Sequence, residues 1–242
     1  MQLQYCTLTG ADDTVDPVDL LALTNEFPFA EFAILLMPSE MGKPRFPTAS
    51  WIKKFTDTMN GKHIGMHLCG PALLDFIDGD MSVLETMKGF DRIQVNVKFA
   101  GMAGKYDPQK LVTRIKASPQ LQFIVQYGKA ENTLLHLLKD VPNHAVLFDE
   151  SAGRGVSPDS WQAPLSGHFC GYAGGLNPDN VKQNLEMIKK VAAGHETWID
   201  METGVRTNDV FDLTKVRRVL EIAKDYAAKA SCDLQRKQEF GL

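Results

Sequence analysis

Short apolar segments of strand length recur along the whole chain, and segments with helical spacing separate them. Strands that alternate with helices pair in parallel, and eight such units close into a barrel more readily than they form an open sheet. We therefore predict an α/β fold, a single-domain (β/α)8 TIM barrel. The expected strands cover residues 3–8, 32–37, 63–68, 92–97, 122–126, 145–148, 169–173 and 198–201.

The helical segments and the chain length agree with this fold. The chain has 242 residues, and such a barrel needs about 250. The absence of a linker predicts one barrel over residues 1–230, and the polar residues 231–242 are predicted to be a frayed tail. The expected helices cover residues 18–27, 49–59, 71–87 with a break near Gly79, 108–116, 132–138, a weak 157–161, a segment opened by Asn177 and Pro178, and 211–228.

Charge and composition exclude several classes of protein. The net charge of −4 is too small to indicate a nucleic-acid partner. No stretch reaches the ~18 apolar residues of a membrane span, and no signal peptide is recognisable, so a cytoplasmic location is expected. The six histidines are scattered, and no metal site is expected. Free thiols are expected at the four cysteines, which are Cys6, Cys69, Cys170 and Cys232.

Two glycine-containing loops follow the last two expected strands. Gly174 and Gly175 come directly after the seventh strand, and a helix start follows them. Thr203 and Gly204 follow the eighth strand after one residue, Glu202. Glycine lets backbone N–H groups approach an oxyanion, and a helix N-terminus favours negative charge. Two such loops from consecutive strands predict one phosphate site, although each alone is also consistent with a tight turn.

Polar side chains stand near the carboxyl ends of most expected strands, which is where active sites lie in such barrels. Asp149 follows a wholly apolar strand, and partial burial there would suit a general acid. Arg154 in the next loop could bind an anionic ligand or be solvated, and we include it among the substrate-binding candidates. Spacing alone favours packing roles for Cys6 and for His67.

Five segments resemble motifs of the phosphoribosylanthranilate isomerase family, in the same order along the chain. Residues 173–181, AGGLNPDNV, are nearly identical to that family's seventh-loop signature. Residues 5–9, YCTLT, resemble its first-strand KICG-hydrophobic-T. Residues 43–46, KPRF, resemble its SKRY, and residues 147–149, LFD, its LLD. Residues 200–205, DMETGV, resemble its DVSSGV.

The resemblance implies a role for each matching residue. Cys6 would be the general base and Asp149 the general acid of an Amadori rearrangement, while Arg45 would hold the anthranilate carboxylate. Asp200 would face the substrate amine. The ring-opened iminium would serve as electron sink, so no cofactor is expected. The phosphate would be held by the backbone around Gly174, Gly175, Thr203 and Gly204.

Two positions depart from the family pattern and keep other readings open. Thr7 stands where the family has glycine, and the sixth loop lacks the family's GGTGK form. One alternative is another aldolase, epimerase or isomerase of phosphosugars, for which Lys98 is the one candidate for a Schiff base. A second alternative is a non-catalytic barrel that binds phosphorylated ligands. The partner in each case is a phosphorylated small molecule, and the oligomeric state is not predicted.

Overall fold

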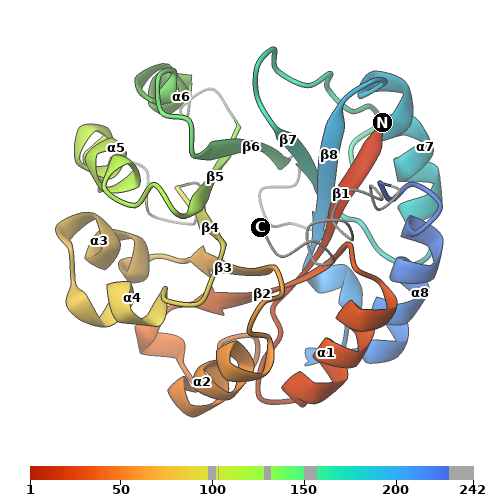
Figure 1. The fold of residues 1–242 in the computed structure, drawn as a ribbon, viewed down its shortest axis with the longest axis horizontal. Coiled ribbons are helices and arrows are strands. Elements are labelled where there is room, and N and C mark those ends of the chain that lie inside the picture. Colours follow the sequence, from red (N-terminus) through yellow and green to blue (C-terminus); the bar gives the residue numbers. More distant parts are fainter. Residues whose placement is uncertain (98–101, 103, 128–131, 150–156, 229–242) are drawn as a thin grey trace, which may run out of the picture.

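The computed structural model describes the chain except residues 98–101, 103, 128–131, 150–156 and 229–242. Within this part, parallel strands form a closed barrel in the order of the sequence, with β1 paired to both β2 and β8 (Figure 1). The predicted (β/α)8 barrel is confirmed. The strands are β1 Gln2–Thr9, β2 Ala30–Leu36, β3 Ile64–Leu68, β4 Arg92–Val95, β5 Gln122–Gln126, β6 His144–Asp149, β7 Cys170–Ala173 and β8 Glu196–Met201.

The helices form a ring outside the barrel (Figure 1). Most begin at a side-chain cap, as at Asp107, whose carboxylate accepts hydrogen bonds from the N–H groups of Gln109 and Lys110. Gly79, at φ 83°, ends α3 and separates it from α4, as predicted. The helices are α1 Pro17–Glu26, α2 Ala49–Thr58, α3 Pro71–Asp78, α4 Met81–Thr86, α5 Pro108–Lys116, α6 Asn132–Leu138, α7 Val181–Val191 and α8 Leu213–Ala223.

Three details differ from the sequence predictions. No helix forms over the described residues 157–161. Helix α7 begins at Val181 and not at Pro178, because the Asn177 side chain accepts hydrogen bonds from two N–H groups and forms a turn first. A short hairpin, β9 Arg206–Thr207 and β10 Val210–Phe211, precedes α8.

The two faces of the barrel sheet have different compositions. The outer face packs apolar side chains against the helices, as Leu8, Phe32 and Ile199 do. The inner face carries most of the buried polar groups, among them Thr7, which donates a hydrogen bond of 2.8 Å to Glu31. Because successive residues of a strand alternate between faces, the register determines which side chains enter the barrel.

A buried ion pair lies deep inside the barrel. Arg92 Nη1 is 2.7 Å from Glu31 Oε1, and both side chains are almost fully buried. The guanidinium also lies over the rings of Tyr5 and Trp198, with its carbon 4.7 and 4.5 Å from their centroids. Trp198 in turn requires Gly171, since a Cβ there would be 2.1 Å from the indole. These groups fill the barrel below the carboxyl ends of the strands.

Within the described residues, no helix is both long and apolar enough to cross a membrane.

Candidate functional site

Three polar side chains from different strands meet inside the barrel, near the carboxyl ends of the strands. Thr9 of β1 donates a hydrogen bond of 2.7 Å to Asp200 Oδ1 of β8. His67 of β3 places Nε2 3.4 Å from the Thr9 hydroxyl and 3.7 Å from Asp200 Oδ2. All three are at least nine-tenths buried. Since β1, β3 and β8 are brought together only by barrel closure, the fold itself builds this cluster.

Burial sets the charge of the cluster. Burial raises the pKa of Asp200 to about 7, and the charges of Glu202, Glu31 and Asp149 add to this rise, against the hydrogen bond from Thr9. Burial and the charge of Arg92 lower the pKa of His67 to about 3. The imidazole is therefore neutral near pH 7, and its 3.7 Å approach to Asp200 is a polar contact and not an ion pair.

Asp149 ends β6 on the same inner face. It is partly buried, and its Oδ2 accepts a hydrogen bond of 3.0 Å from Gln126. The register pairs Asp149 with Ala173, and Ala173 with Asp200. The two aspartates therefore stand two strands apart on one face, with backbones roughly 10 Å apart. This separation leaves room for a small molecule between two groups that can exchange protons.

The loops after β7 and β8 are in direct backbone contact. Gly174 and Gly175 have φ values of 134° and 60°, which favour glycine. Asn180 Nδ2 binds the Gly175 carbonyl at 2.8 Å and so fixes the first loop. A Cβ on Gly204 would lie 1.9 Å from the carbonyl oxygen of Leu176. The two predicted phosphate loops are thus adjacent, at the same end of the barrel as Asp149 and Asp200.

We expect Gly204→Ala to separate these loops and to lower the free energy of unfolding by roughly 1–3 kcal/mol, as overpacking does. The measurement is urea unfolding of both proteins. Gly194→Ala is the control, since a Cβ there meets nothing within 4 Å and costs only the strain of φ 78°. An equal or smaller loss in Gly204→Ala than in the control would contradict the close contact.

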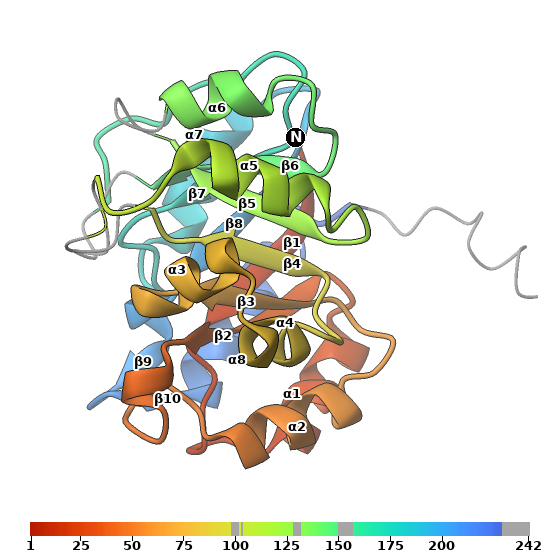
Figure 2. The same ribbon diagram turned by 90° about the vertical axis from the view of Figure 1, so that its left-hand side faces the viewer.

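Arg45 joins the loop after β2 to the loop after β8. Its Nη1 lies 2.6 Å from Glu202 Oε1 and 3.2 Å from Thr203 Oγ1, and its Nε lies 2.6 Å from Asp209 Oδ1. Its own N–H donates to Asp12, at a φ of 75°. Figure 2 shows the β9–β10 hairpin beside the segment that follows β2. Arg45 therefore reaches the predicted phosphate loops, but carboxylates of the chain already occupy two of its donor groups.

Cys6 is not at this site. Its register partner on β8 is Ile199, whereas the inward-facing Thr7 pairs with Asp200. The thiol is fully buried in the apolar layer between barrel and helices. Burial raises its pKa far above the usual range, with smaller contributions from Asp200 and Glu31. The expected position of this cysteine has to be corrected: it lies on the opposite face of β1 from Thr9.

A second thiol lies nearer the barrel mouth. Cys69 directly follows β3, and its sulfur accepts a hydrogen bond of 3.1 Å from Asn96 Nδ2. Burial raises its pKa to about 12, against that hydrogen bond, so this thiol is protonated near pH 7.

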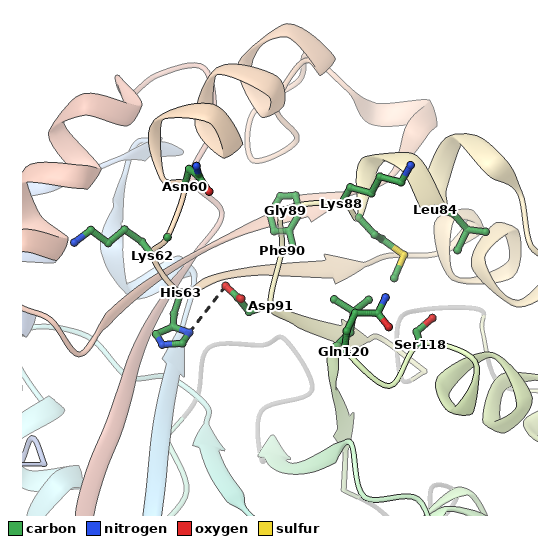
Figure 3. A pocket seen from close by; sticks show the side chains of 13 residues that line it. Asn60, Lys62, His63, Leu84, Lys88, Gly89, Phe90, Asp91, Ser118 and Gln120 are labelled. Atoms are coloured by element: carbon green, nitrogen blue, oxygen red, sulfur yellow. Dashed lines mark ion pairs between the residues drawn. The ribbon is translucent and has the colours of Figure 1, made fainter. Parts of the chain in front are cut away.

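A pocket of about 670 Å³ lies at the opposite, amino-terminal end of β3, β4 and β5. His63 and Asp91 point toward one another at its wall, 4.0 Å apart (Figure 3). Both are largely exposed, as are most of the polar groups around them. Because barrels of this kind place their chemistry at the carboxyl ends of the strands, this pocket is not the candidate site. Among the described residues, no group of His, Cys, Asp and Glu could hold a metal ion.

The family model described as N-(5'-phosphoribosyl)anthranilate (PRA) isomerase matches residues 94–222, more than half of the chain. The chain belongs to the N-(5'-phosphoribosyl)anthranilate isomerase family. No curated protein sequence matches it.

Solved structures of this family have the same fold. TrpF from Jonesia denitrificans is 17% identical, covers 92% of this chain and 98% of its own, and has a TM-score of 0.62. The phosphoribosyl anthranilate isomerase from Thermococcus kodakaraensis is 15% identical. The match covers 92% of this chain and 100% of that protein, with a TM-score of 0.53. Another barrel, KGPDC from Streptococcus mutans, is 11% identical. The match covers 93% of this chain and 100% of that protein, and its TM-score is also 0.53. At these identities the likeness concerns the fold.

The residues matched to the isomerase family divide by position. Asp149, Asp200, Arg45 and the glycine loops gather at the carboxyl end of the barrel, and Arg154 lies outside the described residues. Cys6 is the exception. The sequence places Thr9, His67 and Glu202 among the polar side chains near strand ends, but it predicts no catalytic or binding role for them. Strand alternation could have indicated that Thr9 and His67 point into the barrel. Residues three apart in a regular strand, such as Cys6 and Thr9, lie on opposite faces.

Proposed function

We propose that the protein isomerises an N-(5-phosphoribosyl)amine from aminoaldose to aminoketose. N-(5-phosphoribosyl)anthranilate, the compound after which the family is named, is the first substrate to test. The observation that carries this proposal is the position of two inward-facing carboxylates, Asp149 and Asp200, beside the adjoining loops of Gly174 and Gly204. A phosphate end and a reacting end would then lie at one barrel mouth.

Asp149 is proposed as the general acid. Its carboxyl group would give a proton to the ribose ring oxygen while the bond between that oxygen and C1 breaks. The lone pair of the substrate nitrogen forms the iminium, which is the electron sink for the next step. Partial exposure at the end of β6 suits a group that must meet substrate, and Gln126 holds one carboxyl oxygen in place.

Asp200 is proposed as the general base, in the role that the resemblance gave to Cys6. It would take the proton from C2, whose electrons pass to the iminium to form an enaminol that tautomerises to the ketose. A base whose pKa is about 7 is partly ionised at neutral pH and still binds a proton well. The hydrogen bond from Thr9 supports the ionised form. Cys6 is buried on the other face of β1, away from the proposed substrate position.

The phosphate is proposed to bind between the loops after β7 and β8. The turn Thr203–Val205 begins with the N–H groups of Thr203 and Gly204. Within the described residues, these two groups make no hydrogen bond inside the turn. The carbonyl of Gly175 is already bound by side chains, among them that of Ser157, which helps to fix the loop. Backbone N–H groups in such loops are suitable partners for a phosphate dianion.

The test is turnover of freshly made N-(5-phosphoribosyl)anthranilate, followed by loss of the anthranilate fluorescence. Cys6→Ala is run beside the parent, and we expect its turnover to stay within about threefold, because the thiol faces the helices. Some loss of stability is expected in this variant from the lost packing. A fall of about 10²-fold or more in turnover by a folded Cys6→Ala protein would return the base role to Cys6. Absence of turnover in the parent with all phosphoribosylamines tried would reject the proposed reaction.

A further inference from the structure

We propose that the site selects a phosphoribosylamine whose nitrogen substituent carries no carboxylate, because Glu202 and Asp209 already occupy Arg45. This inference rests on the proposed function and concerns the substrate class of the same site. It departs from the role that the family resemblance implies for Arg45.

Arg45 is bound on two sides by carboxylates of the chain. Nη1 contacts Glu202 Oε1 and Nε contacts Asp209 Oδ1, each at 2.6 Å. The side chains of Arg45 and Glu202 are 28% and 33% exposed, so their ion pair is partly shielded from water, whereas Asp209 is 47% exposed. A planar guanidinium binds a carboxylate best through two parallel donors. A substrate carboxylate would have to displace one of these partners or accept a less favourable geometry.

The backbone of Arg45 is also fixed. Its N–H donates to Asp12 Oδ2 at 2.8 Å, and the same oxygen lies 2.6 Å from Arg206 Nη2. Both Asp12 and Arg206 are almost fully buried. Arg206 belongs to the hairpin after β8, so this network ties the loops after β1, β2 and β8 together. Arg45 thus has partners at its backbone N–H, Nε and Nη1 before any ligand arrives, and its contacts hold the barrel mouth together.

Glu202 places a negative charge at the carboxyl end of β8. It directly follows β8, two residues after Asp200, and its charge contributes to the raised pKa values of Asp200 and Cys69. The carboxylate lies at this end of the barrel, where it pairs with Arg45. The family motif has serine at this position, with no charge. A carboxylate on the substrate near Glu202 would meet a like charge, and this repulsion is strong where water is partly excluded.

Two matched ligands test this selectivity without turnover. N-(5-phosphoribityl)anthranilate and N-(5-phosphoribityl)aniline are stable reduced amines that differ by one carboxylate. We expect the parent to bind the aniline compound at least tenfold more tightly in calorimetry. Glu202→Ser, which restores the family residue, should narrow this ratio by at least tenfold through tighter binding of the anthranilate compound. Glu202→Gln should act in the same direction with less change in volume.

Glu85→Gln is the charge-matched control. Glu85 pairs with Lys88 on the surface, beside the amino-terminal pocket, and its loss should leave the ratio unchanged. Equal or tighter binding of the anthranilate compound by the parent, or a ratio that Glu202→Ser leaves unchanged, would overturn the inference. Failure of both ligands to bind would overturn it together with the phosphate site. The expected ratio without turnover of any phosphoribosylamine would reject the reaction and keep the selectivity.

Discussion

Asp149→Asn should lower turnover of the best phosphoribosylamine substrate by about 10²–10⁴-fold, the usual contribution of a general acid. Asparagine has nearly the same shape and keeps one oxygen that can accept the hydrogen bond from Gln126. It has no acidic proton for the ribose ring oxygen. Ligand affinity should therefore stay within severalfold of the parent, while kcat falls.

This split between kcat and binding is measured by single-turnover kinetics and by calorimetry with N-(5-phosphoribityl)aniline. Asp140→Asn is the control, because Asp140 is an exposed acid just before β6 and its side chain is 84% exposed. Turnover by Asp149→Asn within threefold of the parent would remove Asp149 from the acid role. Loss of binding together with turnover would indicate that the aspartate positions the substrate or the loop.

The fold could be predicted from the sequence because local periodicity determines it. The segments of residues 108–116, 122–126 and 132–138 were predicted with the bounds that the structure has. Each is bounded by residues with a clear local preference, such as Pro108 at a helix start. The expected helix at 157–161 had no comparable apolar stripe, and none forms there.

The site could be predicted only where one strand end determines it. Asp149 follows an apolar strand and ends up on the inner face at the barrel mouth. Cys6 was placed by its likeness to a motif, whereas its side-chain direction depends on the register of β1 against β8. A shift of one residue in such a register moves a side chain to the other face. Motif similarity does not carry that information.

Contacts between loops that are distant in the chain could not be predicted from the sequence. Arg45 meets Glu202 across 157 residues, and Thr9 meets Asp200 across 191. No local pattern selects which arginine and which acid will pair, because barrel closure and the hairpin after β8 set those distances. The specificity proposed here therefore depends on tertiary structure, although Glu202 at a serine position is visible in the sequence.

Asp200→Asn should abolish turnover and also change how stability depends on pH. The parent's Asp200 is protonated in the folded state up to about pH 7, while in the unfolded chain its pKa is 3.8. Between these values unfolding releases a proton, so the parent loses stability as pH rises from about 4 to about 7 and then levels off. Asparagine does not titrate. The free energy of unfolding of the variant relative to the parent should rise over this window, by at most on the order of 4 kcal/mol.

The same titration predicts the activity profile. A base must be ionised to accept the C2 proton, so kcat/KM of the parent should rise with pH through about 7. Stability and activity then change in opposite directions over one pH range, because ionisation of a buried carboxylate costs folding energy and supplies the base. Urea unfolding at pH 4.5, 6 and 7.5, together with kcat/KM at each pH, checks both expectations.

If the difference in free energy of unfolding between the parent and Asp200→Asn does not change over this pH range, Asp200 is already ionised in the folded protein. If that difference is constant and kcat/KM still rises with pH, another group is responsible for the rise in kcat/KM. Asp200 would then bind the substrate amine and would not remove the C2 proton.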